Sequence, residues 1–257
     1  MKVQILVSTM HQTDYSLVKK MNIFTDTIVI NQCENTAYTS FEYNGHLVEW
    51  YDCEERGVGK SRNRALMAAT ADICLFADDD MIYENDALGK IERGFNKYKD
   101  AALIVFNVQM GNNTDLHIKN EHRLNQINAY KYGAVNCAIR RKKILESRIF
   151  YSLLFGGGAE YSCGEDTLFI ADCLKNKLHL YAIPDLIGLN EIGDSTWFNG
   201  YTKKYFYDKG VLYKSMTPRL AILYCIRFVL LHKDMFIAEV SIKQALEWML
   251  EGVKNEY

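Results

Sequence analysis

The sequence predicts an α/β fold in which a mostly parallel central sheet is followed by a C-terminal helical extension. Apolar strand-like runs alternate with helix-like segments through the first half of the chain, a pattern typical of parallel strands joined by helices on both faces of a sheet. Hydrophobic residues make up 49% of the 257 residues and charged residues 24%. That balance is typical of a globular protein and excludes intrinsic disorder.

The first half of the chain contains the elements that define the predicted sheet. Strands are expected at 3–7, 27–30, 47–51, 73–77 and 102–108, and helices at 13–22, 60–69 and 84–97. Ligands bind such sheets at the carboxyl ends of the strands. We therefore expect a ligand site at the loops 8–10, 31–34 and 78–80.

The second half is less regular and continues without a linker. The elements expected here are a strand at 135–139, a short helix opened by the basic run 140–143, a flexible glycine loop at 155–159 and a helix at 165–175. Residues 200–257 are expected to be largely helical. We divide the chain into segments 1–110, 111–199 and 200–257.

The charge is small overall but unevenly distributed. The formal net charge of −2 speaks against nucleic acid as a partner, because nucleic-acid-binding domains are usually clearly basic. Residues 200–257 nevertheless carry nine Lys and Arg against six Asp and Glu. The seven cysteines include no C-x-x-C pair, so we expect buried free thiols in a reducing cytoplasm and no zinc site.

Three adjacent carboxylates, Asp78, Asp79 and Asp80, directly follow the predicted strand at 73–77. They repel one another, and a divalent cation among them would relieve that repulsion. Oxygen ligands suit Mg²⁺ or Mn²⁺, which bind one or two carboxylates together with substrate phosphates. Such an ion would neutralise charge on a departing diphosphate. The alternative is a solvated acidic turn.

The segment 57–64 is expected to be a loop that enters a helix. It ends like a Walker A loop, but Glu54 occupies the position where that motif needs glycine. Arg62 and Arg64 lie near the helix N-terminus, which attracts anions. They would meet a nucleotide diphosphate or stack on a base, unless this is an ordinary solvated helix start.

A second carboxylate pair, Glu165 and Asp166, opens the predicted helix at 165–175. Carboxylates at a helix start can simply complement the helix dipole. They can also include a general base that takes a proton from an acceptor hydroxyl. Shortly before them, Gly157 and Gly158 would allow the backbone to approach a ligand closely.

Taken in order, the segments 3–10, 57–66, 78–80 and 164–169 resemble the family 2 glycosyltransferases, which invert the anomeric centre and have the GT-A fold. The resemblance covers about residues 1–215. It implies that 1–110 is the nucleotide-sugar-binding half of a GT-A domain, 111–199 the acceptor-binding half and 200–257 an extension. Residues 194–198 and the aromatic residues after them resemble a segment of bacterial cell-surface polysaccharide enzymes.

The resemblance also implies roles for individual residues. The implied nucleotide-binding residues are Ser8, Thr9 and Met10 at the base, Asn31 at a pyrimidine edge, Arg62 at the base or diphosphate, Asp79 at the ribose, and Asp78. Asp80 would bind Mn²⁺ or Mg²⁺, with Asp78 as the alternative partner. Asp166 would be the catalytic base, and Glu165 would help to place the acceptor. From their own chemistry we also expect Gly157 and Gly158, which let the backbone approach closely, and Trp197, whose ring can stack on a sugar, to contact the acceptor; aromatic core packing is the alternative for Trp197.

The expected function is therefore a metal-dependent inverting glycosyltransferase of surface polysaccharide synthesis. It would move a sugar from a nucleotide-diphosphate donor to a hydroxyl of a glycan or lipid-linked acceptor. A UDP-sugar is favoured and a dTDP-sugar stays open, because Asn31 stands where the family often has Asp. The alternatives are a nucleotidyltransferase that makes a nucleotide-sugar and a non-catalytic nucleotide-sugar-binding partner subunit.

The C-terminal extension contains an apolar run at 220–231, which is shorter than the about 20 residues that span a bilayer. Residues 203–233 contain seven Lys and Arg against one Asp. Basic residues around an apolar helix favour an interfacial position on anionic lipid. We expect a cytoplasmic protein with peripheral contact to the inner face of the plasma membrane through 203–233. Packing on the catalytic domain or a homodimer contact is the alternative.

Overall fold

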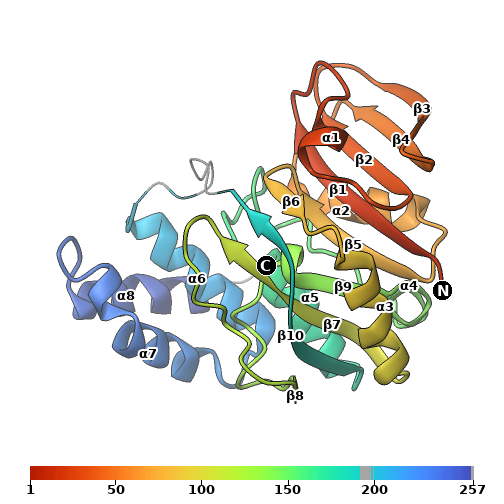
Figure 1. Cartoon of the computed structure of the whole chain (residues 1–257). Coiled ribbons are helices and arrows are strands. Elements are labelled where there is room, and N and C mark those ends of the chain that lie inside the picture. Colours follow the sequence, from red (N-terminus) through yellow and green to blue (C-terminus); the bar gives the residue numbers. More distant parts are fainter. Residues whose placement is uncertain (192–197, 199, 256–257) are drawn as a thin grey trace.

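The computed structural model describes residues 1–191, 198 and 200–255, and a ten-stranded sheet forms its centre. The strand order is β3-β4-β2-β1-β5-β9-β7-β10-β6, and β8 pairs with β10 (Figure 1). The strands are β1 (Val3–Met10), β2 (Thr27–Gln32), β3 (Ala37–Tyr43), β4 (His46–Cys53), β5 (Ile73–Asp78), β6 (Met81–Tyr83), β7 (Ala101–Met110), β8 (His122–Arg123), β9 (Cys137–Arg140) and β10 (His179–Asn190).

Most of the sheet is parallel, as the sequence predicts. β4, β2, β1 and β5 form a continuous parallel ladder, and β7 and β10 are parallel to each other. β9 lies between β5 and β7 and is antiparallel to both. The carboxyl ends of the parallel strands therefore meet at one edge of the sheet, where ligand sites form.

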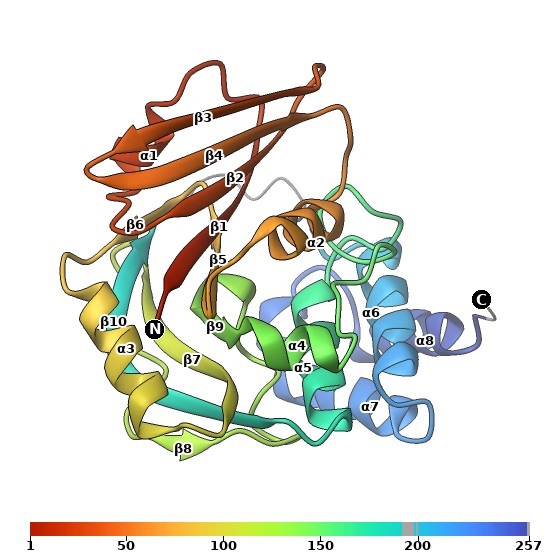
Figure 2. The same cartoon turned by 90° about the vertical axis from the view of Figure 1, so that its right-hand side faces the viewer.

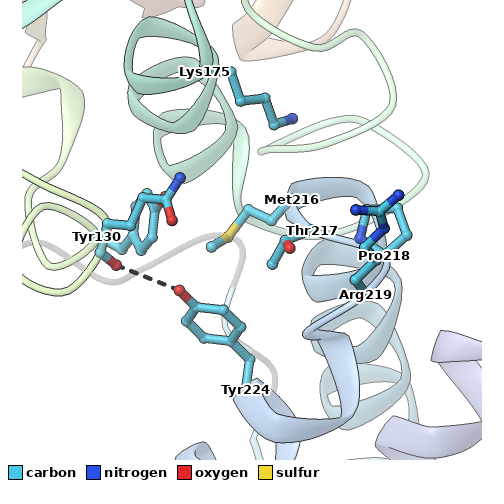
Figure 3. Close-up of a pocket in the computed structure, with 8 residues that line it drawn as sticks. Tyr130, Lys175, Met216, Thr217, Pro218, Arg219 and Tyr224 are labelled. Atoms are coloured by element: carbon cyan, nitrogen blue, oxygen red, sulfur yellow. Dashed lines mark hydrogen bonds between the residues drawn. The ribbon is translucent and has the colours of Figure 1, made fainter. Parts of the chain in front are cut away.

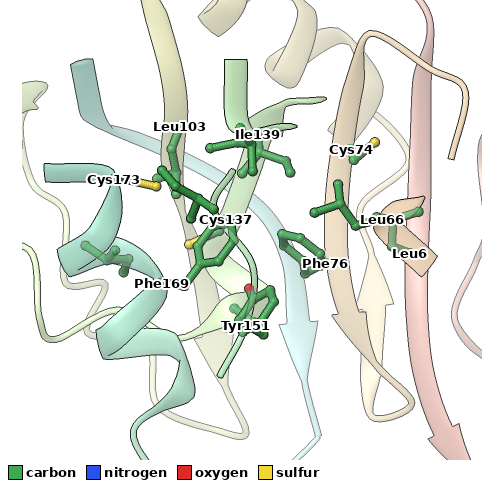
Figure 4. Close-up of a cluster of buried hydrophobic side chains, with 14 of the residues drawn as sticks. Leu6, Leu66, Cys74, Phe76, Leu103, Cys137, Ile139, Tyr151, Phe169 and Cys173 are labelled. Carbon is green, nitrogen blue, oxygen red and sulfur yellow. The ribbon is translucent and has the colours of Figure 1, made fainter. Parts of the chain in front are cut away.

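Helices cover both faces of the sheet (Figure 2). The helices are α1 (Leu17–Lys20), α2 (Val58–Ala68), α3 (Ala87–Lys97), α4 (Arg141–Glu146), α5 (Glu165–Lys175), α6 (Lys203–Met216), α7 (Ala221–Leu231) and α8 (Ile242–Val253), with short 3-10 turns at Ala134–Asn136 and Lys233–Met235. On one face α2, α4 and α5 bury Leu66, Ile144 and Phe169 against the sheet, and Figure 4 shows Leu66 and Phe169 in this cluster. On the other face α1 and α3 bury Leu17 and Ile91. This two-sided burial explains why the central strands are continuous apolar runs.

Four strands were not expected from the sequence: β3, β6, β8 and β10. β3 and β4 form a hairpin through Asn44 and Gly45, whose φ angles of 51° and 79° suit a two-residue hairpin turn. β10 contains Pro184 and pairs with β7 through three register shifts, so it lacks a regular strand pattern. The helix expected at 13–22 is shortened to α1 (Leu17–Lys20).

The C-terminal helices form a bundle with its own core. Phe206, Phe228, Phe236 and Met249 are buried together between α6, α7 and α8. A second cluster joins this bundle to the sheet domain, because Leu212 of α6 packs with residues next to and on α5. None of the helices within the described residues is long and apolar enough to cross a lipid bilayer. All seven cysteines are described, and they are free thiols.

Candidate active site

Two of the predicted ligand loops lie side by side at the carboxyl edge of the sheet. Ser8 of β1 pairs in register with Asp78 of β5. One residue further along each strand, the Thr9 hydroxyl donates a 2.5 Å hydrogen bond to Oδ2 of Asp79. The parallel pairing of β1 and β5 thus brings together residues that are 70 positions apart.

The Ser61-Arg62-Asn63 segment lies in the first two turns of α2 and links several parts of the site. The Ser61 hydroxyl donates to the Ser8 hydroxyl at 2.8 Å. Asn63 forms two hydrogen bonds with the backbone of Tyr151, at 2.8 and 2.9 Å. The Arg62 guanidinium lies over the Tyr151 ring, 5.2 Å from its centroid. Ser61 therefore connects α2 to the end of β1, and Arg62 and Asn63 both connect it to Tyr151.

Arg62 is the centre of the site. Its side chain is only 4% exposed and forms ion pairs with Asp78 at 3.0 Å, Glu165 at 3.0 Å and Asp166 at 2.7 Å. It therefore joins the carboxylates after β5 to those that open α5. Its expected contact with the base or diphosphate stays a prediction, since the bonds present here go to carboxylates.

Three carboxylates around one guanidinium leave the site with an excess of negative charge. Burial alone would lower the pKa of Arg62, but the surrounding carboxylates raise it well above its ordinary value. Burial raises the pKa of Asp166 to about 7, against the positive charge of Arg62 and with the help of Glu165 and Asp78. A carboxylate with a pKa near neutral pH is suited to general-base catalysis.

Glu165 and Asp166 differ in accessibility and partners. The Glu165 carboxylate is 12% exposed, accepts from the Gly164 backbone N–H at 3.1 Å, and lies against Gly156. The Asp166 side chain is 24% exposed and faces the turn that starts at Gly133. Of the two, Asp166 is the carboxylate that a substrate can reach more readily.

Asp80 is held by the end of β10, a strand that the sequence analysis did not predict. The Asn190 side-chain amide donates to Oδ1 of Asp80 at 2.6 Å, and the Glu191 N–H donates to its carbonyl at 2.8 Å. Burial and the negative charges of Asp78 and Asp79 raise the pKa of Asp80 to about 6.

A divalent ion fits this corner by its chemistry. Within the described part of the chain, no three Asp, Glu, His or Cys side chains are arranged as ligands of one metal ion. Mg²⁺ and Mn²⁺ are often held by one or two carboxylates, with substrate phosphates completing the coordination. The crowded negative charge around Asp80 fits such an ion, whereas a closed protein site is not built here.

Asn31 orders the loop after β1. Its side chain bonds the Gln12 N–H and carbonyl, both at 3.0 Å, and donates to Oδ1 of Asp52 at 2.7 Å. Its predicted contact with a pyrimidine edge stays a prediction, and these bonds already use both ends of its amide. Sequence reasoning missed Asp52, although it is the second-to-last residue of β4, which ends at the same edge. Met10 at the end of β1 is 44% exposed.

The glycine loop connects the starts of α2 and α5. The Gly157 carbonyl accepts from the Val58 N–H at 2.9 Å, and a Cβ on Gly158 would lie 3.1 Å from the Gly57 nitrogen. The contact of Gly157 and Gly158 with the acceptor stays a prediction. What the structure shows is that both residues pack against the start of α2. Trp197 lies outside the described residues.

The fold and this edge of the sheet define the class: a GT-A fold with a carboxylate cluster facing a second carboxylate pair. Residues 12–150, more than half of the chain, match the family model for Glycosyl transferase family 2, and the chain belongs to that family. It is therefore a glycosyltransferase. No curated protein sequence matches the chain.

Solved structures show the same fold. The chain is similar to S. aureus TarS 1–349 in complex with UDP-GlcNAc, with a TM-score of 0.70 and 14% identity over 98% of this chain and 82% of that one. TarS 1–349 in complex with UDP gives a TM-score of 0.66 and 14% identity over 99% and 81%. A further structure of S. aureus TarS gives a TM-score of 0.66 and 14% identity over 99% of this chain and 50% of that one.

Proposed function

We propose that this glycosyltransferase moves a sugar, with inversion, from a UDP-sugar to a hydroxyl of a glycan or lipid-linked acceptor in bacterial surface polysaccharide synthesis. The observation that carries the proposal is Arg62, which joins Asp78 on the donor side to Asp166 on the acceptor side. The likeness to TarS in complex with UDP-GlcNAc supports UDP as the nucleotide. A dTDP-sugar is the remaining alternative.

In the proposed reaction Asp166 takes the proton of the acceptor hydroxyl. The hydroxyl oxygen bonds to the anomeric carbon while the bond from that carbon to the donor diphosphate breaks, and the nucleoside diphosphate leaves. A single displacement with nucleophile and leaving group in line inverts the anomeric centre. The pKa of Asp166, raised to about 7 by burial, matches a base that must be ionised near neutral pH.

The donor is proposed to bind along the ends of β1 and β5. Ser8, Thr9 and Met10 lie beside the base, and Asp79, held by Thr9 at 2.5 Å, contacts the ribose. Asp80, with Asp78 as alternative partner, would hold Mn²⁺ or Mg²⁺, which neutralises charge on the diphosphate when bound. Glu165 places the acceptor next to Asp166.

The experiment measures nucleotide release with UDP-GlcNAc and Mn²⁺, after a thermal-shift comparison of UDP-, dTDP- and GDP-sugars selects the nucleotide. Asp166→Asn should lower the turnover rate by about 10²-fold or more, the usual contribution of a general base, and should still bind UDP. The matched control is Asp172→Asn, an exposed carboxylate on the same helix. Wild-type turnover in Asp166→Asn would contradict the mechanism and favour the non-catalytic partner subunit.

A nucleotidyltransferase would be recognised by its product. It should release inorganic diphosphate from UTP and a sugar phosphate, whereas the proposed enzyme should release UDP. The end of β1 and the loop after it give that alternative little support, because residues 8–12 contain no glycine, lysine or arginine and the Gln12 side chain donates to the Thr9 hydroxyl at 3.0 Å.

We also propose that residues 203–233 bring the enzyme to the anionic inner face of the plasma membrane. One face of α7 exposes apolar side chains, each 38–61% accessible: Ile222, Leu223, Ile226, Leu230 and Leu231. Arg219 and Arg227 are exposed on the same helix or just before it. Arg219 and Lys175 also line a cavity of about 310 Å³ beside the start of α7 (Figure 3). Exposed apolar and basic side chains together suit an anionic lipid surface.

Vesicle co-sedimentation tests this contact. Wild-type protein should bind vesicles that contain phosphatidylglycerol and should not bind neutral phosphatidylcholine vesicles. Leu223→Glu combined with Leu230→Glu should abolish binding, while Met67→Glu, an equally exposed position on α2, should not. A dimer in light scattering that the double variant dissociates, without any vesicle binding, would assign α7 to a homodimer instead.

A further inference from the structure

Residues 160–164, directly before helix α5 with the proposed base Asp166, are held by the C-terminal bundle. Oδ2 of Asp208, on α6, accepts hydrogen bonds from the backbone N–H and the hydroxyl of Ser162, both at 2.9 Å. Asp208 is only 1% exposed. Ser162 lies four residues before Asp166, so α6 reaches the chain just before it enters α5.

The burial of the Asp208 carboxylate is compensated by a cation on the preceding turn of its own helix. Lys204 donates to both oxygens of Asp208, at 2.8 and 3.0 Å, and also to the Glu160 carbonyl at 2.8 Å. A buried carboxylate is stable only when it is paired and hydrogen-bonded. Asp208 and Lys204 thus form one unit with two bonds to Ser162 and one to Glu160.

Two more contacts join the same segment to the bundle. Asn255, just after α8, donates to the Tyr161 hydroxyl at 3.0 Å. Gly164 is the N-cap of α5 with φ of 117°, and a Cβ there would lie 2.7 Å from Leu212 of α6. Residues 160–164 are therefore held by the C-terminal bundle, by α6 at Glu160, Ser162 and Gly164 and by the chain after α8 at Tyr161.

This arrangement leaves Asp166 with two kinds of support. Arg62 holds its carboxylate from the sheet side at 2.7 Å, and α6 holds the backbone that leads into it. General-base catalysis depends on placement to within a fraction of an ångström, and a misplacement of about 1 Å can cost about 10²-fold in rate. A residue that fixes this backbone affects the chemical step without touching the substrate.

We propose that Asp208 is a positioning residue of the glycosyl-transfer reaction, which holds residues 160–164 so that Asp166 is placed to receive the acceptor proton. The inference rests on the proposed function of Asp166. It also makes the C-terminal bundle a working part of the catalytic site. Within the described residues, the hydrogen bonds of the Asp208 side chain go to Ser162 and Lys204 and not to β1 or β5, so donor binding should not depend on Asp208.

The test separates kcat from the KM of the donor in the full chain. Asp208→Ala should lower kcat at least tenfold while the KM and the dissociation constant of the UDP-sugar change less than twofold. Asp208→Asn keeps an oxygen that can accept from Ser162, and should restore most of kcat. Glu251→Ala, which breaks a surface ion pair between α8 and Lys203, is the matched control and should retain wild-type kcat.

Ser162→Ala covers the case in which Asp208→Ala fails to fold, since it removes one hydrogen bond and leaves the carboxylate paired. It should lower kcat several-fold with unchanged donor KM. Wild-type kcat in Asp208→Ala or Ser162→Ala, or a loss in Asp208→Asn equal to that in Asp208→Ala, would overturn the positioning role. Asp166→Asn is run in parallel: if it alone keeps wild-type kcat, the proposed base fails, whatever Asp208 does.

Discussion

The two sides of the site, which we propose bind the donor and the acceptor, are built in different ways. On the donor side, the parallel pairing of β1 and β5 brings the Thr9 hydroxyl within 2.5 Å of Oδ2 of Asp79. The pairing of these two central strands therefore largely determines the geometry. On the acceptor side, Asp166 depends on Arg62 from α2 and on a segment that α6 holds through Asp208. The donor side is thus a property of the sheet, and the acceptor side is assembled from distant parts of the chain.

This contrast predicts where substitutions act most strongly. The largest loss of stability and activity is expected when Arg62, which joins the two sides, is replaced. A substitution that loosens the acceptor side should have an intermediate effect, and one that removes a proposed metal ligand on the donor side should have the smallest.

Arg62→Met should have the largest effect. It leaves three carboxylates without their buried cation, and breaking a buried ion pair typically costs about 3–5 kcal/mol. Denaturant unfolding should show a loss of that size together with loss of transfer. Arg64→Met is the control, because Arg64 makes an exposed pair with Glu55, and its loss should be about 1 kcal/mol or less. Similar losses in the two variants would contradict the central role of Arg62.

Gly164→Ala should destabilise the acceptor side by about 1–3 kcal/mol. Alanine is strained at a φ of 117°, and its Cβ would lie 2.7 Å from Leu212. Gly157→Ala is the control, because a Cβ there meets nothing within 4 Å. Melting temperatures report the stability of both variants, and donor binding reports on the opposite side. If Gly164→Ala weakens UDP binding as much as it lowers stability, the two sides are not separate.

Asp80→Asn should have the smallest effect, confined to the donor side. It should weaken Mn²⁺-dependent UDP binding about tenfold and leave stability without metal unchanged or slightly raised, since it removes one of three neighbouring negative charges. Titration calorimetry measures the binding, with Asp86→Asn, an exposed position, as control. Protons compete with the metal for Asp80, whose burial raises its pKa to about 6, so the effect of Mn²⁺ should fade below that pH. Equal Mn²⁺ dependence in wild type and Asp80→Asn would refute the assignment.

The sequence was most informative where function follows a central strand. The apolar runs in the sequence predicted the positions of β1 and β5. The end of the predicted β5 then identified Asp78 to Asp80 as candidate site residues. Asp52 was missed although its strand was expected at 47–51, because a single carboxylate near a strand end does not stand out in the sequence as the three adjacent carboxylates after β5 do.

The acceptor side could be predicted only in part. Glu165 and Asp166 stand out at a helix start, but their partner Arg62 is more than 100 residues away. Asn190 was missed because β10 is interrupted at Pro184 and lacks strand periodicity. Asp208 looks like an ordinary helix carboxylate paired with Lys204 in the sequence. Its burial is visible only after α6 packs on residues 160–164.

The pH dependence of turnover tests the role of Asp166 most directly. Burial raises its pKa to about 7, and a general base works only when it is ionised. In wild type kcat should therefore be constant above pH 7 and fall about tenfold per pH unit below it. Asp166→Asn should show a low kcat that lacks this fall below pH 7, while Asp172→Asn should keep the fall. If kcat of Asp166→Asn still falls below pH 7 as it does in wild type, Asp166 is not the base and the proposed mechanism is wrong.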